Sequence, residues 1–91
     1  MSKKRAHVTI KGRVQGVFFR TTAEEKASSL GISGWITNRR DGTVEGLFEG
    51  EEEAVDEMVS WCYEGSGPAD VRDVDVKEEE YTGELNGFSV R

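Results

Sequence analysis

Residues 6–20 have the sequence AHVTIKGRVQGVFFR, and this stretch decides how the fold begins. Apolar and polar side chains alternate over residues 6–11, a pattern typical of a strand with one buried face. Gly12 and Gly16 then bracket a loop. After Arg20, the spacing of Ala23, Ala27 and Leu30 predicts a short helix from about Thr21 to Leu30, and Gly31 follows it in the usual position for a helix end.

The remaining elements follow in a regular order. They are a strand over 33–38, a turn at Asp41-Gly42, a strand over 43–49, a helix that opens at Gly50, a strand over 71–76 and a short strand over 87–90. This order predicts an α+β fold, the ferredoxin-like split βαβ sandwich (βαββαβ plus a short C-terminal strand) with an antiparallel sheet and two helices on one face. Residues 1–91 are expected to form a single domain, because the chain is shorter than a typical domain of about 100–150 residues.

Charge is divided unevenly along the chain. Residues 1–40 carry nine basic and two acidic side chains, a net charge of +7, whereas residues 41–91 carry three basic and sixteen acidic side chains, a net charge of −13. The overall charge of −6 disfavours a general nucleic-acid surface, so no nucleic-acid partner is expected. Any anion site is expected within residues 1–40, and added salt should weaken substrate capture if folding preserves this positive patch.

Cysteine use and hydropathy indicate the cellular setting. Cys62 is the one cysteine, it shares a helical face with Val55, Met58 and Val59, and we expect it in the core. No apolar run approaches the ~18 residues of a transmembrane helix, and the basic start is not followed by the apolar segment of a signal peptide. We therefore expect a cytoplasmic protein without a membrane partner, acting as a monomer.

The loop from Gly12 to Arg20 joins a strand to a helix N-terminus, where unpaired backbone N–H groups and the helix dipole favour an anion. It lacks the Gly-Lys-Ser/Thr of a Walker A loop and the G-x-G-x-x-G of a dinucleotide site, so no nucleotide cofactor is indicated. Arg20 is a cation at the helix start, an unfavourable place unless an anion binds there. Its side chain either extends into solvent or joins the loop amides in holding one phosphate.

The stretch from Gly34 to Glu45 is, on its pattern, a β-hairpin with a polar turn. Asn38 either caps the end of the first strand or uses its uncharged amide to hold a water molecule beside a bound anion. Arg39 and Arg40 are interpreted as solvated turn residues that would also attract an anionic substrate.

Aromatic side chains bear on an alternative function. We expect Trp35, Phe48, Trp61 and Phe88 in the core, and one of Phe18 and Phe19 beneath the loop. An RNA-binding sheet of this fold would expose aromatic side chains on its central strands. The outward positions of these strands are instead predicted to be His7, Thr9, Lys11, Glu45, Leu47 and Glu49.

Two stretches resemble a known family. Gly12 to Arg20 resembles the acylphosphatase signature G-x-V-Q-G-V-x-[FY]-R, and Gly34 to Glu45 resembles that family's second motif, G-[FYW]-[VI]-x-N-x-x-D-G-x-V-E. Residues 67–71 and 87–90 are similar to further family blocks. The resemblance implies a free-standing hydrolase that cleaves the carboxyl–phosphate bond of small acyl phosphates, without a metal or an organic cofactor.

The resemblance also implies roles for particular residues. Arg20 would bind the substrate phosphate together with the backbone amides of Gln15, Gly16, Val17, Phe18, Phe19 and Arg20, and Asn38 would orient the attacking water. Two alternatives remain: a non-catalytic module that binds anions or single-stranded RNA, and an acylphosphatase-like domain of a larger carbamoyl-transfer protein.

The chemistry agrees with so small a set of residues. The leaving group is a carboxylate whose conjugate acid has a pKa near that of Glu, about 4.3, so no general acid is needed. Phosphoryl transfer depends mainly on positioning and charge stabilisation. His7 is expected on the solvent face rather than as a base, and the substrate's own phosphate oxygen is a hypothetical proton acceptor.

Overall fold

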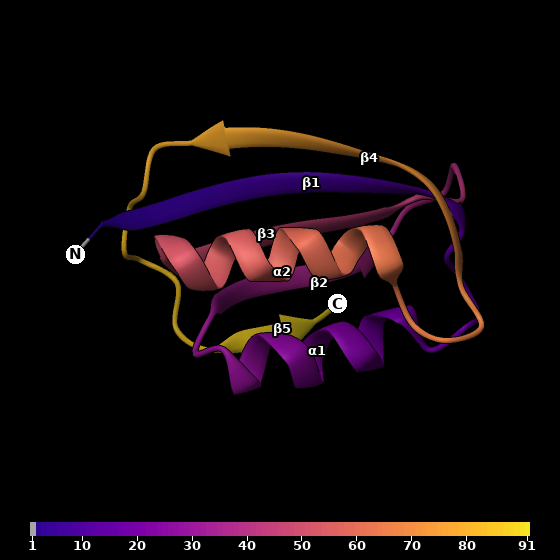
Figure 1. Ribbon diagram of the computed structural model, residues 1–91, viewed down its shortest axis with the longest axis horizontal. Coiled ribbons are helices and arrows are strands. Elements are labelled where there is room, and N and C mark those ends of the chain that lie inside the picture. Colours follow the sequence, from indigo (N-terminus) through magenta and orange to yellow (C-terminus); the bar gives the residue numbers. More distant parts are fainter. Residues whose placement is uncertain (1) are drawn as a thin grey trace.

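A computed structural model of the protein describes residues 2–91. Its elements are β1 (Lys3–Arg13), α1 (Phe19–Ser29), β2 (Ser33–Asn38), β3 (Val44–Glu51), α2 (Glu52–Glu64), β4 (Asp70–Glu79) and β5 (Phe88–Val90), as shown in Figure 1. The strands form one sheet in the order β4-β1-β3-β2-β5. The predicted ferredoxin-like βαββαβ fold with a short final strand is confirmed.

The predicted antiparallel arrangement holds for β4, β1, β3 and β2. The last strand differs, because β5 pairs with β2 in parallel. The chain leaves β4 at one edge of the sheet, passes one end of it and returns along the opposite edge (Figure 1). The sheet is therefore mixed, and residue 91 follows directly after a strand that borders β2.

Both helices cover the same face of the sheet, and the core lies between the two layers (Figure 1). Phe48 is fully buried, Phe88 stacks against it, and Trp61 packs on Phe19, so these three predicted core aromatics are confirmed. Cys62 is also fully buried, as predicted. Within residues 2–91, neither helix has the length and the apolar character that crossing a bilayer requires.

Trp35 is not a core residue, and its prediction is wrong. Gly34 and Ile36 occupy the buried positions of β2, so the alternation of the strand turns Trp35 to the open face of the sheet. There it is directly paired with Leu47, which is paired in turn with His7. The guanidinium of Arg91 lies 5.0 Å from the centre of the Trp35 ring and partly covers it.

Both helices begin at other residues than predicted. α1 starts at Phe19 rather than Thr21, because Phe18 takes the left-handed conformation (φ 62°) and forms the N-cap. α2 starts at Glu52 rather than Gly50, because β3 stays paired with β1 as far as Glu51, opposite Lys3.

Candidate active site

The loop between β1 and α1 starts where β1 bends. The pairing of β1 with β4 shifts between Lys11 and Gly12, a β-bulge, and Gly12 has a φ of 126°. A Cβ at this position would lie 2.2 Å from the main-chain oxygen of Asp70. Glycine is therefore required at the point where the chain leaves the sheet to form the loop.

The loop is fixed to the body of the protein from two sides. Val14, Val17 and Phe19 are buried, and the hydroxyl of Ser66, in the connection after α2, donates a 2.7 Å hydrogen bond to the carbonyl of Val17. On the other side, Nε2 of Gln15 donates to the carbonyl oxygens that flank the β2–β3 turn, those of residues 39 and 43, at 2.7 and 2.9 Å. The loop is thus held against the hairpin that carries Asn38.

Backbone donors are concentrated in the loop. Gly16 (φ 72°) and Phe18 (φ 62°) both have left-handed backbone conformations. No acceptor for the N–H groups of residues 15–20 is found among residues 2–91, and no side chain caps α1. A loop with several unpaired N–H groups at the start of a helix favours an anion.

Arg20, the second residue of α1, is half-buried and does not extend into solvent. Its Nη1 donates a 2.7 Å hydrogen bond to the main-chain oxygen of Arg91. That oxygen also accepts a 3.2 Å hydrogen bond from the hydroxyl of Thr37, and the N–H of Arg91 donates to Ile36 at 2.8 Å. Because β5 pairs with β2, the main-chain oxygen of Arg91 lies where it can accept this hydrogen bond and orient the guanidinium. The other N–H groups of the guanidinium are not used in this bond.

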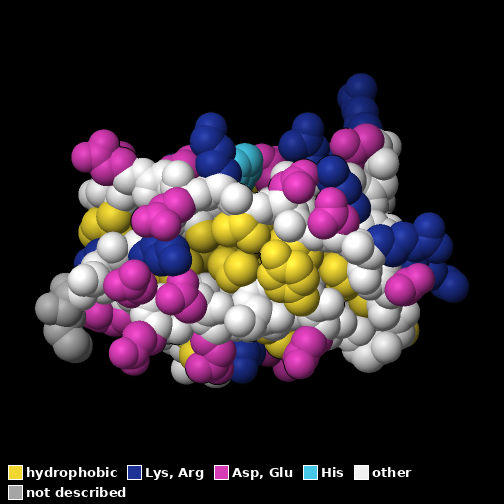
Figure 2. Space-filling view, turned by 45° about the horizontal axis from the view of Figure 1, so that its top comes forward, with side chains coloured by type: hydrophobic (Ala, Val, Ile, Leu, Met, Phe, Trp, Pro, Cys, Tyr) yellow, Lys and Arg dark blue, Asp and Glu magenta, His cyan; other side chains and the backbone are white. Residues whose placement is uncertain are grey.

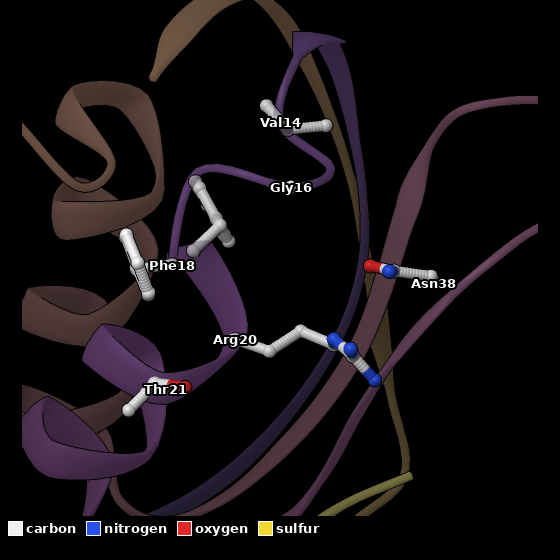
Figure 3. Close-up of a pocket in the computed structure, with 7 residues that line it drawn as sticks. Val14, Gly16, Phe18, Arg20, Thr21 and Asn38 are labelled. Atoms are coloured by element: carbon white, nitrogen blue, oxygen red, sulfur yellow. The ribbon is translucent and has the colours of Figure 1, made fainter. Parts of the chain in front are cut away.

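Asn38 is the last residue of β2, and its side chain is exposed. Figure 3 shows its amide directed toward the guanidinium of Arg20, across the space beside the loop. No hydrogen bond of this amide to another group within residues 2–91 is found. Its donors and acceptor thus remain available to a small molecule such as water.

The loop, Arg20 and Asn38 enclose a hollow of about 220 Å³. It is lined by Val14, Gly16, Phe18, Phe19, Arg20, Thr21 and Asn38. Among these residues Arg20 alone is charged, so a bound anion would have one full positive charge and the loop N–H groups as its partners. The hollow thus joins residues of the two sequence motifs.

The predicted site residues are placed as follows. Gly16, Phe18, Phe19, Arg20 and Asn38 line the hollow, whereas Gln15 and Val17 belong to the loop but do not line it. Sequence reasoning missed Val14 and Thr21 in the lining and the main-chain oxygen of Arg91. A main-chain acceptor carries no side-chain signal, so no pattern pointed to Arg91. Phe19 is the phenylalanine that packs beneath the loop, and Phe18 is exposed.

The turn that follows Asn38 is held by Asp41. Its carboxylate accepts hydrogen bonds from the hydroxyl and the N–H of Thr43, at 2.6 and 3.0 Å. These bonds, the hydroxyl of Thr43 first, lower the pKa of Asp41 below its ordinary value, so the carboxylate stays charged and keeps the turn closed near neutral pH.

Most basic side chains of residues 1–40 form ion pairs with acidic side chains, and a few do not. Six basic side chains of residues 1–40 lie within 4.0 Å of acidic side chains of residues 41–91: Lys3, Lys4, Arg5, Lys11, Lys26 and Arg39. No such partner within residues 2–91 is found for Arg13, Arg20 or Arg40. These three lie at the end of β1, the start of α1 and the β2–β3 turn. The end of β1 and the turn lie at the right of Figure 1, and Figure 2 shows basic side chains projecting at the same end of the molecule.

The comparisons with known proteins agree with the two motifs. Residues 6–90 match the family model described as acylphosphatase. The chain is 51% identical over 90 residues to an acylphosphatase of Pelotomaculum thermopropionicum, covering 99% of this chain and 98% of the relative. It is 56% identical over 90 residues to an acylphosphatase of a Roseiflexus species, covering 99% of this chain and 97% of the relative.

A solved structure gives the same result for the fold. The crystal structure of acylphosphatase from Bacillus subtilis superposes with a TM-score of 0.93 at 35% identity, covering 97% of this chain and 98% of that one. The family predicted from the loop and hairpin motifs is confirmed: this chain belongs to the acylphosphatase family.

Proposed function

We propose that the hollow beside the loop is the place where this acylphosphatase (EC 3.6.1.7) hydrolyses acyl phosphates, with Arg20 and Asn38 in separate roles. The observation that carries the proposal is the meeting of three features in one hollow: the loop N–H groups, the guanidinium of Arg20 and the amide of Asn38. Each matches one requirement of the reaction.

The phosphate group of the substrate binds to the loop N–H groups of residues 15–20 and to the guanidinium of Arg20. Arg20 keeps one N–H on the carbonyl of Arg91, so its remaining donors face the anion in a fixed orientation. These donors stabilise the charge on the equatorial phosphate oxygens during transfer. The loop is held by Gln15 and Ser66 before substrate arrives, so little reorganisation is needed.

Asn38 orients the attacking water. Its side chain has a carbonyl oxygen to accept one proton of the water and an NH₂ group to contact the phosphate. The water oxygen bonds to phosphorus while the bond from phosphorus to the carboxylate oxygen breaks, and one water proton passes to a phosphate oxygen. The products are a carboxylate and inorganic phosphate, and the weakly basic leaving group needs no general acid.

Phosphate release from acetyl phosphate tests the proposal, with Arg20→Ala and Asn38→Ala beside wild type. Asn38→Ala should lower kcat with little change in KM, whereas Arg20→Ala should lower kcat and raise KM. Arg72→Ala and Asn86→Ala are matched controls, because both side chains are exposed and neither lines the hollow. Wild-type turnover no faster than that of both site variants would refute the proposal.

The open face of the sheet offers little support for RNA binding. Trp35 lies on it, but Arg91 covers part of the ring, and the partly exposed carboxylates of Glu45 and Glu79 lie on the same face. Acidic side chains repel a phosphate backbone. A gel shift with single-stranded RNA at low salt is expected to show no complex, and tight binding would favour the alternative.

A further inference from the structure

Phe18 is an unusual residue for the rim of an anion site. Its side chain is 75% exposed, and its backbone has φ 62° and ψ 21°, a left-handed conformation that costs roughly 1–2 kcal/mol for a residue other than glycine. Glycine, as at Gly16, would avoid both the exposed apolar surface and the strain.

The backbone around Phe18 is fixed. The N–H and the hydroxyl of Thr22 both donate to the carbonyl of Phe18, at 3.0 and 2.8 Å. Phe18 also lines the same hollow as Arg20 and Asn38. The start of an exposed apolar side chain is thus held at one defined place beside the hollow.

The geometry of phosphoryl transfer indicates what this ring would meet. The attacking and leaving oxygens lie roughly in line through phosphorus, on opposite sides. If Asn38 holds the water, the acyl group leaves on the side away from Asn38. Figure 3 shows Phe18 and Thr21 on that side, beyond the backbone of Arg20.

We propose that Phe18 forms the acyl-binding side of the site and gives the enzyme a preference for acyl phosphates with apolar or aromatic acyl groups. The inference rests on the proposed function. An exposed ring gains free energy when an apolar acyl group covers it, and an aromatic acyl group adds ring–ring contact. A charged acyl group gains no such partner, because Arg20 is the one charged residue in the lining.

The test compares kcat/KM for benzoyl phosphate with kcat/KM for acetyl phosphate. Wild type should prefer benzoyl phosphate. Phe18→Asn removes the ring, and asparagine tolerates the left-handed conformation better than most residues. It should lower the ratio of benzoyl to acetyl phosphate turnover roughly tenfold, as expected for the loss of a modest apolar contact. Phe18→Tyr keeps the ring and should keep the ratio near that of wild type.

Controls separate the ring from the loop backbone. Phe18→Gly is a second variant without the ring and without conformational strain, so the test does not depend on the folding of one variant. Tyr63→Asn removes an exposed aromatic side chain of α2 that does not line the hollow, and the ratio should stay unchanged. Inhibition by inorganic phosphate, which has no acyl group, reports on the phosphate-binding groups, the loop N–H groups and Arg20, without the acyl side.

Each outcome then has a separate meaning. An unchanged ratio in Phe18→Asn and Phe18→Gly, in an enzyme that hydrolyses both substrates, would overturn this inference and leave the proposed function intact. The inference would also be overturned if these variants lost benzoyl phosphate turnover, acetyl phosphate turnover and inhibition by phosphate to the same extent. Wild type that hydrolyses neither substrate would overturn the proposed function and the inference with it.

Discussion

Nη1 of Arg20 lies 2.7 Å from the main-chain oxygen of Arg91, so the start of α1 is bonded directly to the residue that follows β5. The two residues are far apart in the sequence and meet only because β5 adds to the sheet beside β2. The guanidinium is thereby held over the hollow in one orientation. The final strand, which also packs Phe88 against the core, thus contributes to the geometry of the site.

Deleting Arg91 removes this acceptor, whereas Arg91→Ala keeps a main-chain oxygen at the same position. The deletion should raise KM for acetyl phosphate about tenfold more than Arg91→Ala does, since hydrogen bonds to charged groups contribute about 1.5–3 kcal/mol. Steady-state kinetics of both variants provide the measurement. Equal effects would show that the side chain over Trp35, rather than the oxygen, matters.

Replacing Gln15 should destabilise the protein and show whether the stability of the loop affects activity. Gln15→Ala removes two hydrogen bonds to carbonyl oxygens of the hairpin and should lower the free energy of unfolding by about 1–2 kcal/mol. Gln15→Glu should lower it further, because a carboxylate would face two carbonyl oxygens without a proton to donate. Urea unfolding of the three proteins, with kcat/KM measured in parallel, tests this order. A glutamate variant as stable as wild type would contradict it.

Added salt should weaken the capture of substrate and leave the chemical step nearly unchanged. Because Arg13 and Arg40 have no acidic partner within residues 2–91, kcat/KM for acetyl phosphate should fall severalfold between about 0.02 and 0.5 M salt while kcat changes little. The double variant Arg13→Gln/Arg40→Gln should flatten this dependence. Lys26→Gln is the matched control, because Lys26 pairs with Glu57 at 2.9 Å. A flat response in wild type would mean that the patch does not act on the substrate.

Cys62 should make the protein less stable at alkaline pH. Burial raises the pKa of its thiol to about 12. In the unfolded chain the thiol ionises near pH 8.5, so unfolding releases a proton above that pH. The stabilisation is complete below about pH 8.5 and is lost as pH rises toward 12, by about 2 kcal/mol between pH 8 and pH 10.

Cys62→Val isolates this effect, since valine has a similar size and does not titrate. The difference in unfolding free energy between wild type and Cys62→Val, measured in urea at both pH values, should shrink by that amount. A constant difference would mean that the thiol also ionises in the folded protein.

Much of the fold was predictable because it depends on local patterns. The alternation in β1, the apolar stripe of α2 and the Asp41-Gly42 turn each determined an element. Helix starts were less accurate, because they depend on events outside the helix: the left-handed Phe18 before α1 and the pairing of Glu51 with Lys3 before α2.

Side-chain burial was predicted less well where it depends on which face of a strand a residue occupies, or on segments that are distant in the sequence. Trp35 and Ile36 are both large apolar residues on adjacent positions, and the sequence does not say which of them faces the core. Glu49 was correctly placed on the open face, yet it is 2% exposed. Arg5 and Thr82 cover it with hydrogen bonds at 2.9–3.2 Å, and Thr82 comes from a connection without a periodic pattern.

The candidate site was predictable where it depends on continuous stretches of sequence. Two motifs contributed Arg20, Asn38 and the loop, and each is a continuous stretch of chain. The acceptor on Arg91 and the anchor on Ser66 come from elsewhere, and only the folded chain brings them to the loop.

The pairing of basic with acidic side chains has a consequence for which anions the protein admits. A small dianion that fits the hollow of about 220 Å³ would meet Arg20, the one charged residue of its lining, and the N–H groups of the loop. A long polyanion would extend beyond the hollow, over a chain whose net charge is −6. We therefore expect the protein to bind short anions in preference to long ones.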